Sequence, residues 1–558
     1  MRRPTPQRGP NKTNVATLPM HFGGVASPSR CCSSCDRLTG RFLSGDVEML
    51  EVGTTCWRAE VAPRAALLVD MEPYLAAAKA AMSQASRSIH FLNWAFDPDT
   101  ILDHEPTDGS GPQTIGRFLR DLSEARPELE IRILCWKSPV AVAATQRFFP
   151  WRSRRFFADT RVEFRLDGTL PPGASHHQKV IIVDDAVAFC GSCDIGPDRW
   201  DSPEHLHPDP RRGKTSKGTP CYDCRHEVMA MIDGPPAATL GDLFRERWAR
   251  ATGEMLAAPA ETVSDVWPAD VKPDLENVEI GVSRTQAPWK DFPELRQGEA
   301  ATLAAIASAK TTLYIENQYF TSPIVAEAIA QRLDEADGPE VVLVSTRHSP
   351  SWFDQMTMDK TRSAFLKRLE DADRHGRFSA YSPVTRNGRI IIVHAKLAVV
   401  DDRFVRIGSS NVNNRSQGFD SECDLTLHAG ADPKGAGGSC VGVFRNRLIA
   451  HWLACEEMQV TQAIMTHGGI RAGIEHLRGE GLDRLRPLRS RSHGAFSRFV
   501  AEHHLGDPIS AADSLRPWRR PAQMRHKLAA AAHRLVRADI PAPDVPLGGS
   551  IEPGVGQD

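Results

Sequence analysis

The chain has 558 residues, of which 41% are hydrophobic and 25% are charged, and its formal net charge is −2 at pH 7. This length exceeds what one hydrophobic core serves and predicts two sizeable domains. The near-neutral charge excludes a strongly basic protein with a general affinity for nucleic acid. The sequence contains no run of 18 consecutive apolar residues, so no transmembrane helix is expected.

The amino-terminal segment, residues 1–42, is rich in Pro, Arg, Ser, Thr and Gly and is expected to be disordered. It begins with charged residues and lacks the apolar stretch of a secretory signal. A cytoplasmic or membrane-peripheral location is therefore expected, with secretion by a non-classical route as the alternative.

The first half of the chain alternates helix-favouring and strand-favouring runs. Alanine-rich residues 74–86 predict a helix, and residues 240–251 predict another. Strands are predicted where β-branched, aromatic and other apolar residues cluster: 88–96, 129–136, 180–183 and 187–191. Strands that alternate with helices indicate an α/β fold with a mixed sheet.

The second half repeats this order. Helices are predicted over 299–310 and 444–454, and strands within 312–320, 340–346 and 388–411. Ile89 matches Leu313 at an offset of 224 residues, and His177 matches His394 at an offset of 217. Offsets this similar predict an internal duplication, with two similar domains that are each a mixed sheet flanked by helices.

Four segments are predicted: a disordered segment 1–42, a first domain 43–260, a second domain 275–460 and a basic, partly helical extension 461–558. A Pro- and Asp-rich stretch near 255–278 is expected to link the domains. The extension is interpreted as a solvated helix packed on the second domain, and contact with anionic lipid head groups is the alternative. A chain that holds both repeats needs no dimer to complete a site, so a monomer is expected.

The twelve cysteines are scattered, which disfavours a disulfide scaffold. Two Cys-x-x-Cys pairs, Cys190 with Cys193 and Cys221 with Cys224, leave a zinc site open. The 27 residues between the pairs exceed the usual spacing of such a site, so buried or incidental thiols are the favoured interpretation.

Each half carries the pattern His-x-Lys-x-x-x-x-Asp at the start of a predicted buried strand. Its residues are His177, Lys179 and Asp184 in the first half and His394, Lys396 and Asp401 in the second. Residues two apart in a strand share a face, so each His and Lys should project together. An Asp–Asp turn follows each strand, and each returning strand is expected to end in a Gly–Ser pair, with the serines Ser192 and Ser409.

One such triplet could be a hydrogen-bonded histidine and a lysine at a sheet edge, but two at equal spacing favour a functional site. Two lysines suit an anionic substrate, and two histidines can divide the roles of nucleophile and general acid. This combination fits a phosphodiester, with the lysines stabilising phosphoryl charge. No carboxylate cluster suited to Mg²⁺ or Ca²⁺ accompanies the motifs, so neither a metal nor another cofactor is expected.

The chain resembles the phospholipase D superfamily, whose mark is this duplicated motif, over about residues 43–460. Further stretches carry the resemblance: "GSCDIGPDRWD" (191–201), "YDCRHEVMAMIDGP" (222–235), "IENQYF" (315–320), "GSSNVNNRS" (408–416) and "DSE" (420–422). The resemblance implies an active site at a pseudo-two-fold interface between the two domains.

The resemblance also implies roles. His177 would be the nucleophile that forms a phosphohistidine, and His394 would protonate the leaving alcohol and then activate water or a second alcohol. Residues implied to bind or support the phosphoryl group are Lys179, Lys396, Asn411, Ser192 and Ser409. Asp223 and Glu422 would orient the imidazoles, and Asp184 and Asp401 would be structural supports. One departure is Asp194, which stands where the second half has Asn411 and cannot donate to a phosphoryl oxygen.

The resemblance favours hydrolysis of a glycerophospholipid, such as phosphatidylcholine, to phosphatidic acid and a free head group at a membrane surface, with transfer to another alcohol as an accompanying reaction. Phosphatidyl transfer of the cardiolipin synthase kind is the first alternative. Nucleic-acid cleavage is the second, and the net charge gives it little support. The stretch 202–220 is interpreted either as a cover over the site or as a solvent loop.

Overall fold

The computed structural model describes residues 48–515, apart from 107–108, 110, 141, 143–148, 197, 214–221, 260–264, 350, 430–439, 480–483, 492–498 and 501. The predicted disordered segment 1–42, Cys221 and part of the stretch 202–220 therefore lie outside the described residues. So does the end of the predicted basic extension. The proposed domain boundaries stay predictions.

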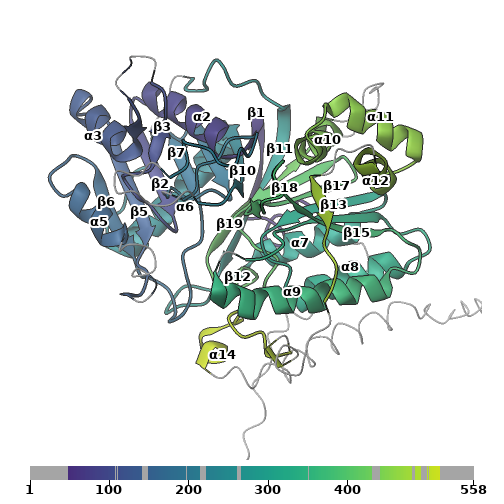
Figure 1. Ribbon diagram of the computed structural model, residues 1–558. Coiled ribbons are helices and arrows are strands. Elements are labelled where there is room, and N and C mark those ends of the chain that lie inside the picture. The colour runs from purple at the N-terminus through teal and green to yellow at the C-terminus, as the bar shows by residue number, and fades with distance from the viewer. Residues whose placement is uncertain are drawn as a thin grey trace, which may run out of the picture.

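The first half of the chain contributes seven strands to the main sheet (Figure 1). They are β1 (Arg58–Val69), β2 (Ser88–Asn93), β5 (Glu130–Trp136), β6 (Glu163–Asp167), β7 (Val180–Val183), β8 (Val187–Gly191) and β10 (Val228–Asp233). The strands of the second half are β11 (Leu275–Gln286), β12 (Leu295–Arg296), β13 (Thr312–Asn317), β14 (Glu340–Val344), β15 (Phe378–Pro383), β17 (Lys396–Val400), β18 (Phe404–Gly408), β19 (Glu422–His428) and β20 (Leu485–Pro487).

These strands form one mixed sheet of sixteen, and the two halves have the same strand order. The order is β6-β5-β2-β7-β8-β10-β1 in the first half and β15-β14-β13-β17-β18-β19-β11 in the second. β1 pairs antiparallel with β11, with Arg58 opposite Val282 and Ala65 opposite Leu275. The predicted α/β class is confirmed, and the two sheets are joined edge to edge. The stretch 255–278, expected as a linker, already enters β11 at Leu275.

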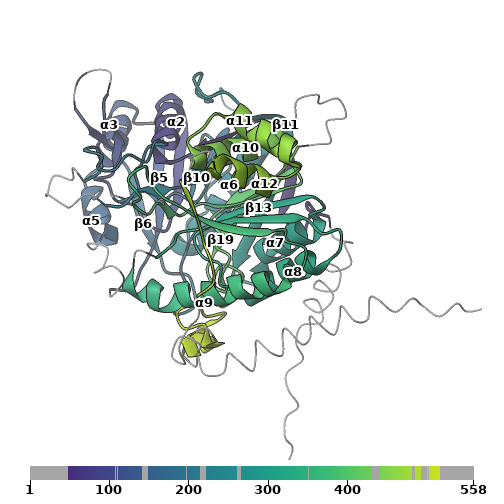
Figure 2. The same ribbon diagram turned by 45° about the vertical axis from the view of Figure 1, so that its right-hand side comes forward.

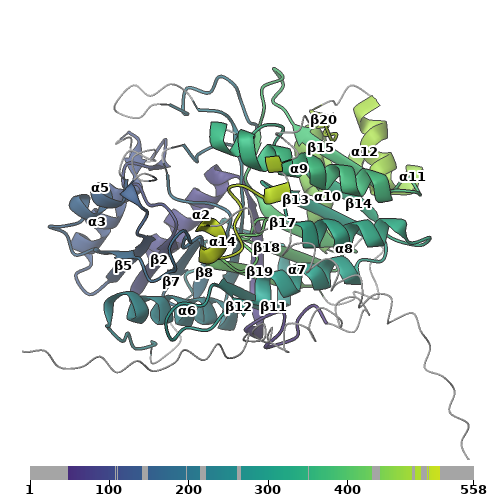
Figure 3. The same cartoon turned by 90° about the horizontal axis from the view of Figure 1, so that it is seen from below.

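Helices cover both faces of the sheet. They are α2 (Met71–Gln84), α3 (Ile115–Ala125), α5 (Phe149–Phe156), α6 (Pro235–Thr252), α7 (Gln297–Ser308), α8 (Pro323–Asp334), α9 (Trp352–Ala372), α10 (Cys440–Leu453), α11 (Glu457–His467), α12 (Ile470–Gly479) and α14 (Ala511–Leu515). The helices α10, α11 and α12 pack together (Figure 2). Seen from below, β11 and β12 lie between α6 and α7 (Figure 3). No helix among the described residues has the length and apolar character to cross a membrane.

Alternating side chains of the strands enter separate hydrophobic cores. Ile181 and Val183 of β7 pack in the core beneath α2 and α3, whereas Val180 and Ile182 pack in the core shared with α6 and α10. The second core extends over strands of both halves, and a third lies under α7, α8 and α9. Because side chains alternate between the faces of a strand, a sheet buried on both faces requires such continuous apolar runs.

Candidate active site

Both motif histidines lie in short segments that lead into central strands. His177 precedes β7, and His394 lies between the two-residue strand β16 (Ile392–Val393) and β17. The backbone N–H of His177 donates to the carbonyl of Ser421 (2.8 Å), and that of His394 donates to the carbonyl of His226 (2.8 Å). Each motif is therefore held by backbone from the other half of the chain.

Glu422, the first residue of β19, stands behind His177. The Nδ1 atom of His177 lies 2.9 Å from a carboxylate oxygen of Glu422, and the Ser409 hydroxyl donates to the same oxygen (2.5 Å). Glu422 is fully buried, while 16% of the His177 side chain is exposed. Burial and the charges of Lys179 and Lys396 hold the pKa of His177 well below its usual value. A neutral His177 that donates from Nδ1 keeps an unprotonated Nε2, which is the nucleophilic form.

Glu227, the residue before β10, occupies the matching position behind His394. Its carboxylate lies 2.8 Å from Nδ1 of His394 and accepts a hydrogen bond from the Ser192 hydroxyl (2.7 Å). The carboxylate is fully buried, and 6% of the His394 side chain is exposed. Burial, and then Lys396, hold the pKa of His394 well below its usual value. A carboxylate behind an imidazole fixes the tautomer and stabilises the imidazolium when it forms.

Glu227 replaces the Asp223 that the sequence analysis assigned to this position. Asp223 lies near the surface, with 48% of its side chain exposed, and pairs with Arg389 at 3.0 Å. The reason is local: β9 (Arg225–His226) pairs with β16, which brings the residue after β9 beside His394. A signal for Glu227 does exist in the sequence, because Glu227 and Glu422 each stand at the start of a strand-forming run, "EVMAMID" and "ECDLTLH".

The two motif lysines are buried near both histidines. Lys179 is fully buried, donates to the carbonyl of His177 (2.6 Å) and pairs with Asp194 at 3.3 Å. Lys396 donates to the carbonyl of His394 and lies 3.5 Å from the Gln318 side-chain oxygen. Burial lowers the pKa of Lys396 to about 7, Glu227 opposes this shift, and Lys179 adds to it. An anion placed between the lysines would restore the charge of Lys396.

Asp194 and Asn411, which occupy matching positions in the two halves, have different surroundings. Asp194 accepts a hydrogen bond from the backbone of Ala95 (3.2 Å) and faces Lys179. Asn411 is buried, and its side-chain oxygen has no hydrogen-bond partner within the described part of the chain. The segment after Asn411 is held by Asp507, whose carboxylate accepts from the backbone N–H of Asn414 and of Arg415 (3.0 Å each). No local sequence pattern indicates this contact from the carboxyl-terminal extension.

Asp184 and Asp401 lie at the far ends of β7 and β17, in the turns that follow. Asp184 accepts hydrogen bonds from the backbone N–H groups of Ser86, Arg87 and Ser88 at 2.7–2.8 Å. Asp401 accepts from residues 310, 311 and 312 at 2.7–2.9 Å. Each motif Asp comes five positions after its motif Lys, which puts about 16 Å between them in an extended strand. These aspartates therefore fix the turn to the preceding helix–strand connection and do not line the site.

The neighbours of His177 turn away from the site. His176 lies between the hydroxyl of Ser421 (2.7 Å) and the carboxylate of Asp167 (2.9 Å), and Gln178 bonds to Arg247 and to the backbone of Glu422. Burial lowers the pKa of His176 to about 4. These contacts hold the segment around His177 in place on the side away from the site.

Two arginines near His394 were not anticipated from the sequence. Arg199 and Arg225 both lower the pKa of His394 through their charge. They come from the segments 191–201 and 222–235 that carry the family resemblance. Additional cations beside a phosphoryl site raise its affinity for an anionic substrate.

The Cys-x-x-Cys pairs do not form a common centre among the described residues. The Cys190 thiol lies 3.9 Å from that of Cys423, and Cys224 lies 2.9 Å from the Arg212 guanidinium. Burial raises the pKa of Cys224 to about 12. The three described cysteines of these pairs, Cys190, Cys193 and Cys224, are buried thiols.

Comparison with known proteins places these features in a family. A family model described as "Cardiolipin synthase, PLD-like domain" matches residues 302–431. The chain is 23% identical over 448 residues to phospholipase D alpha 4 of Arabidopsis thaliana, covering 60% of this chain and 58% of that protein. It is 22% identical over 483 residues to phospholipase D1 of Schizosaccharomyces pombe, covering 68% and 35% of the two chains. The chain thus spans less than two thirds of the length of each of these relatives.

Among solved structures, the phosphatidylserine synthase of Haemophilus influenzae aligns with a TM-score of 0.47 at 12% identity, covering 87% of this chain and 96% of that one. The sequence relatives and the family model agree on one assignment. Together with the duplicated motif, they support an assignment to the phospholipase D superfamily.

Proposed function

We propose that the protein is a phosphodiesterase of the phospholipase D type that cleaves the head-group ester of a glycerophospholipid such as phosphatidylcholine, giving phosphatidic acid and the free head group. One observation carries the proposal. Each of two imidazoles lies beside a buried carboxylate that accepts a hydrogen bond from a serine hydroxyl. The charges of the same two buried lysines lower the pKa of both imidazoles. Such a set can attack, protonate and neutralise a phosphodiester with side chains alone.

In the first step, Nε2 of His177 bonds to phosphorus and the bond from phosphorus to the leaving alcohol oxygen breaks. The proton on Nε2 of His394 passes to that oxygen. His177 is the better candidate for the nucleophile because its side chain is the more exposed of the two. Lys179 and Lys396 stabilise the charge on the phosphoryl oxygens.

In the second step, Nε2 of His394 takes a proton from water while the water oxygen bonds to phosphorus. The bond from phosphorus to His177 breaks, which restores both histidines. The pKa of His394 is lowered in the free site, so its protonation depends on the substrate. The negative charge of a bound phosphodiester favours the imidazolium, and Glu227 stabilises it.

Transfer to a second alcohol is the other candidate, and the description of the matching family model as a cardiolipin synthase domain favours it. The two reactions share the first step and differ only in whether water or an alcohol enters in the second. Products from phosphatidylcholine and from phosphatidylglycerol, each with and without added glycerol, separate hydrolysis from transfer. Single-stranded DNA as a third substrate tests for nuclease activity.

The two histidine roles can be separated by the choice of leaving group. In a p-nitrophenyl phosphodiester the leaving group is p-nitrophenolate, which needs no proton to depart. His394→Ala should therefore give a burst of p-nitrophenolate and a trapped phosphoenzyme. His177→Ala should give neither. A burst from His177→Ala and none from His394→Ala would reverse the assignment. Steady turnover by both variants would refute the two-histidine mechanism.

A further inference from the structure

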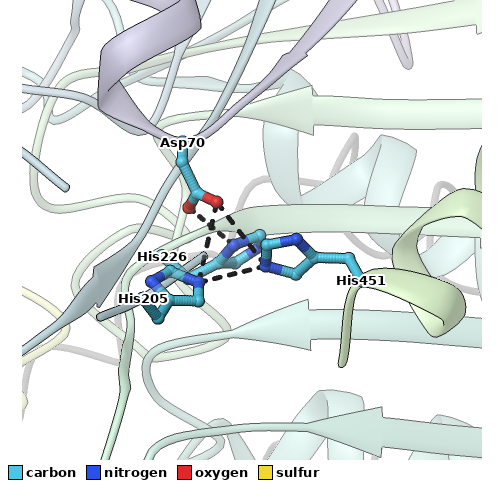
Figure 4. Close-up of side chains that lie close together, drawn as sticks. All are labelled: Asp70, His205, His226 and His451. Atoms are coloured by element: carbon cyan, nitrogen blue, oxygen red, sulfur yellow. Dashed lines mark hydrogen bonds and ion pairs between the residues drawn. The ribbon is translucent and has the colours of Figure 1, made fainter. Parts of the chain in front are cut away.

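Four polar side chains from distant parts of the chain converge outside the site described above. This Asp–His cluster consists of Asp70, His205, His226 and His451 (Figure 4). One carboxylate or imidazole atom from each lies within 4.8 Å of all the others. Asp70 follows β1, His205 lies in the described part of the stretch 202–220, His226 ends β9, and His451 is in α10.

The spacing of these atoms is that of ligands around one small cation. Nε2 of His205 lies 3.0 Å from Nε2 of His451, and Oδ2 of Asp70 lies 3.6 Å and 3.5 Å from these two atoms. Tetrahedral zinc with bonds of about 2.0–2.1 Å separates its ligand atoms by about 3.3 Å. Nδ1 of His226, 2.9 Å from the other oxygen of Asp70, completes the group.

Two further carboxylates hold the imidazoles in position from behind. Nδ1 of His205 lies 2.8 Å from Asp201, and Nε2 of His226 lies 2.8 Å from Glu316. Glu316 also accepts hydrogen bonds from the hydroxyl of Tyr314 (2.5 Å) and the indole of Trp452 (2.7 Å). Metal-binding histidines usually donate their second ring N–H to a carboxylate, which turns the free lone pair toward the ion.

A bound cation would also offset the negative charge of the buried carboxylates in the cluster. The Oδ2 atom of Asp70 is fully buried and has no hydrogen-bond donor in the described part of the structure. Three buried carboxylates, those of Asp70, Asp201 and Glu316, meet here. Arg212 lies 3.5 Å from Asp201, and the buried Arg484 donates to the backbone carbonyl of His451 (3.4 Å). A divalent ion would place positive charge beside Oδ2 of Asp70, the oxygen that has no donor in the described part of the structure, and a buried carboxylate oxygen without such a partner is costly.

The competing arrangement is a protonated His226 between Asp70 and Glu316. These two carboxylates raise the pKa of His226 to about 10 against the effect of burial. That arrangement accounts for one oxygen of Asp70 but leaves Oδ2 without a donor beside two imidazole nitrogens. A metal ion in place of the Nδ1 proton satisfies all four atoms.

We propose that the Asp–His cluster binds one zinc ion. Imidazole nitrogens with one carboxylate are a ligand set that suits zinc, and four protein ligands leave no open position. The site is therefore structural and not a second reaction centre. It connects β1, β9 and the segment of His205 to α10, which the chain reaches only in its second half.

The proposed site has a direct connection to the catalytic histidine. The backbone carbonyl of His226 accepts hydrogen bonds from the N–H groups of His394 (2.8 Å) and Ala395 (3.1 Å). The next residue, Glu227, is the carboxylate behind His394. An ion on His226 would therefore position both residues without contacting substrate.

The test uses the full-length protein and does not depend on activity. Mass spectrometry of the purified wild type should find one zinc per chain. After removal by a chelator, the melting temperature should fall, and added Co²⁺ should give the intense visible absorption of a tetrahedral site. His451→Gln should lose the metal, and Asp201→Asn should weaken binding about 10- to 100-fold. His90→Gln, at a buried histidine outside the cluster, should keep it.

Wild-type protein that carries no zinc and gives no tetrahedral Co²⁺ spectrum overturns the proposal. Equal zinc content in wild type and His451→Gln overturns it as well, because the metal would then lie elsewhere. If His451→Gln fails to fold, the Co²⁺ titration of the wild type decides. Failure of the proposed phosphodiesterase activity would leave these readouts unchanged.

Discussion

The clearest perturbation of the proposed mechanism is Glu227→Gln, which removes the charge behind His394 and keeps the shape of the side chain. A carboxylate and an imidazolium with charge centres about 4 Å apart attract by about 4 kcal/mol at an effective dielectric constant of about 20. The neutral amide retains a hydrogen bond worth about 1 kcal/mol. The net loss of about 3 kcal/mol corresponds to a decrease in kcat/KM of roughly 100-fold.

The assay is head-group release from phosphatidylcholine, with thermal melting to show that each variant is folded. Asp223→Asn is the matched control, because Asp223 is four residues away and pairs with Arg389 at the surface. The control should retain wild-type kcat/KM. Loss of activity in Asp223→Asn, with near wild-type activity in Glu227→Gln, would refute the assignment of Glu227.

Three further predictions follow from the same contacts. Asp184→Asn should lower the free energy of unfolding by about 2–3 kcal/mol, because charge-assisted hydrogen bonds to three backbone N–H groups are weakened. The kcat of the folded protein should stay unchanged. Denaturant unfolding checks the first result and an activity assay checks the second. The value of kcat/KM should decrease as pH rises through about 7, because Lys396 loses its proton there. Lys396→Arg should extend the active range to higher pH, even if its kcat is lower, because arginine keeps its charge. An unchanged decrease on the alkaline side in this variant would contradict the role of Lys396. Added Mg²⁺ or Ca²⁺ should leave kcat unchanged, and activation by either ion would show that the histidines and lysines are not sufficient.

Much of the fold could be predicted from local patterns. The runs around Ile89 and Leu313 are rich in β-branched, aromatic and other apolar residues, and both are central strands that are buried on both faces. The strand β1 was not predicted, because Pro63 interrupts its pattern and proline removes a ladder hydrogen bond. The structure resolves this conflict: β10 pairs with β1 only from Ala65 onward, so Pro63 lies where one side of the strand is unpaired.

The motif residues of the candidate site could be predicted from the sequence because they occur twice. Their hydrogen-bond partners were harder to predict. His177, Lys179 and their second-half counterparts share one spacing, which a single sequence reveals. The pairing of His177 with Glu422, 245 residues away, depends on the meeting of β1 and β11, which no local pattern encodes. The family resemblance implied Asp223 for this role, whereas the pairing of β9 with β16 brings the carboxylate of Glu227 to the imidazole.

Each half of the chain supplies the carboxylate and serine that hold the motif histidine of the other half, so the geometry of each half depends on the other. His177 takes its carboxylate and serine from the second half, and His394 takes both from the first. Neither half alone would hold an oriented imidazole, because the buried carboxylate would lose its partner and the histidine its tautomer. The continuous sheet, the paired strands β9 and β16 and the Asp–His cluster all cross between the halves near these contacts. Displacement at this boundary should therefore reduce kcat before it unfolds either half, because proton transfer depends on distances of a few tenths of an ångström.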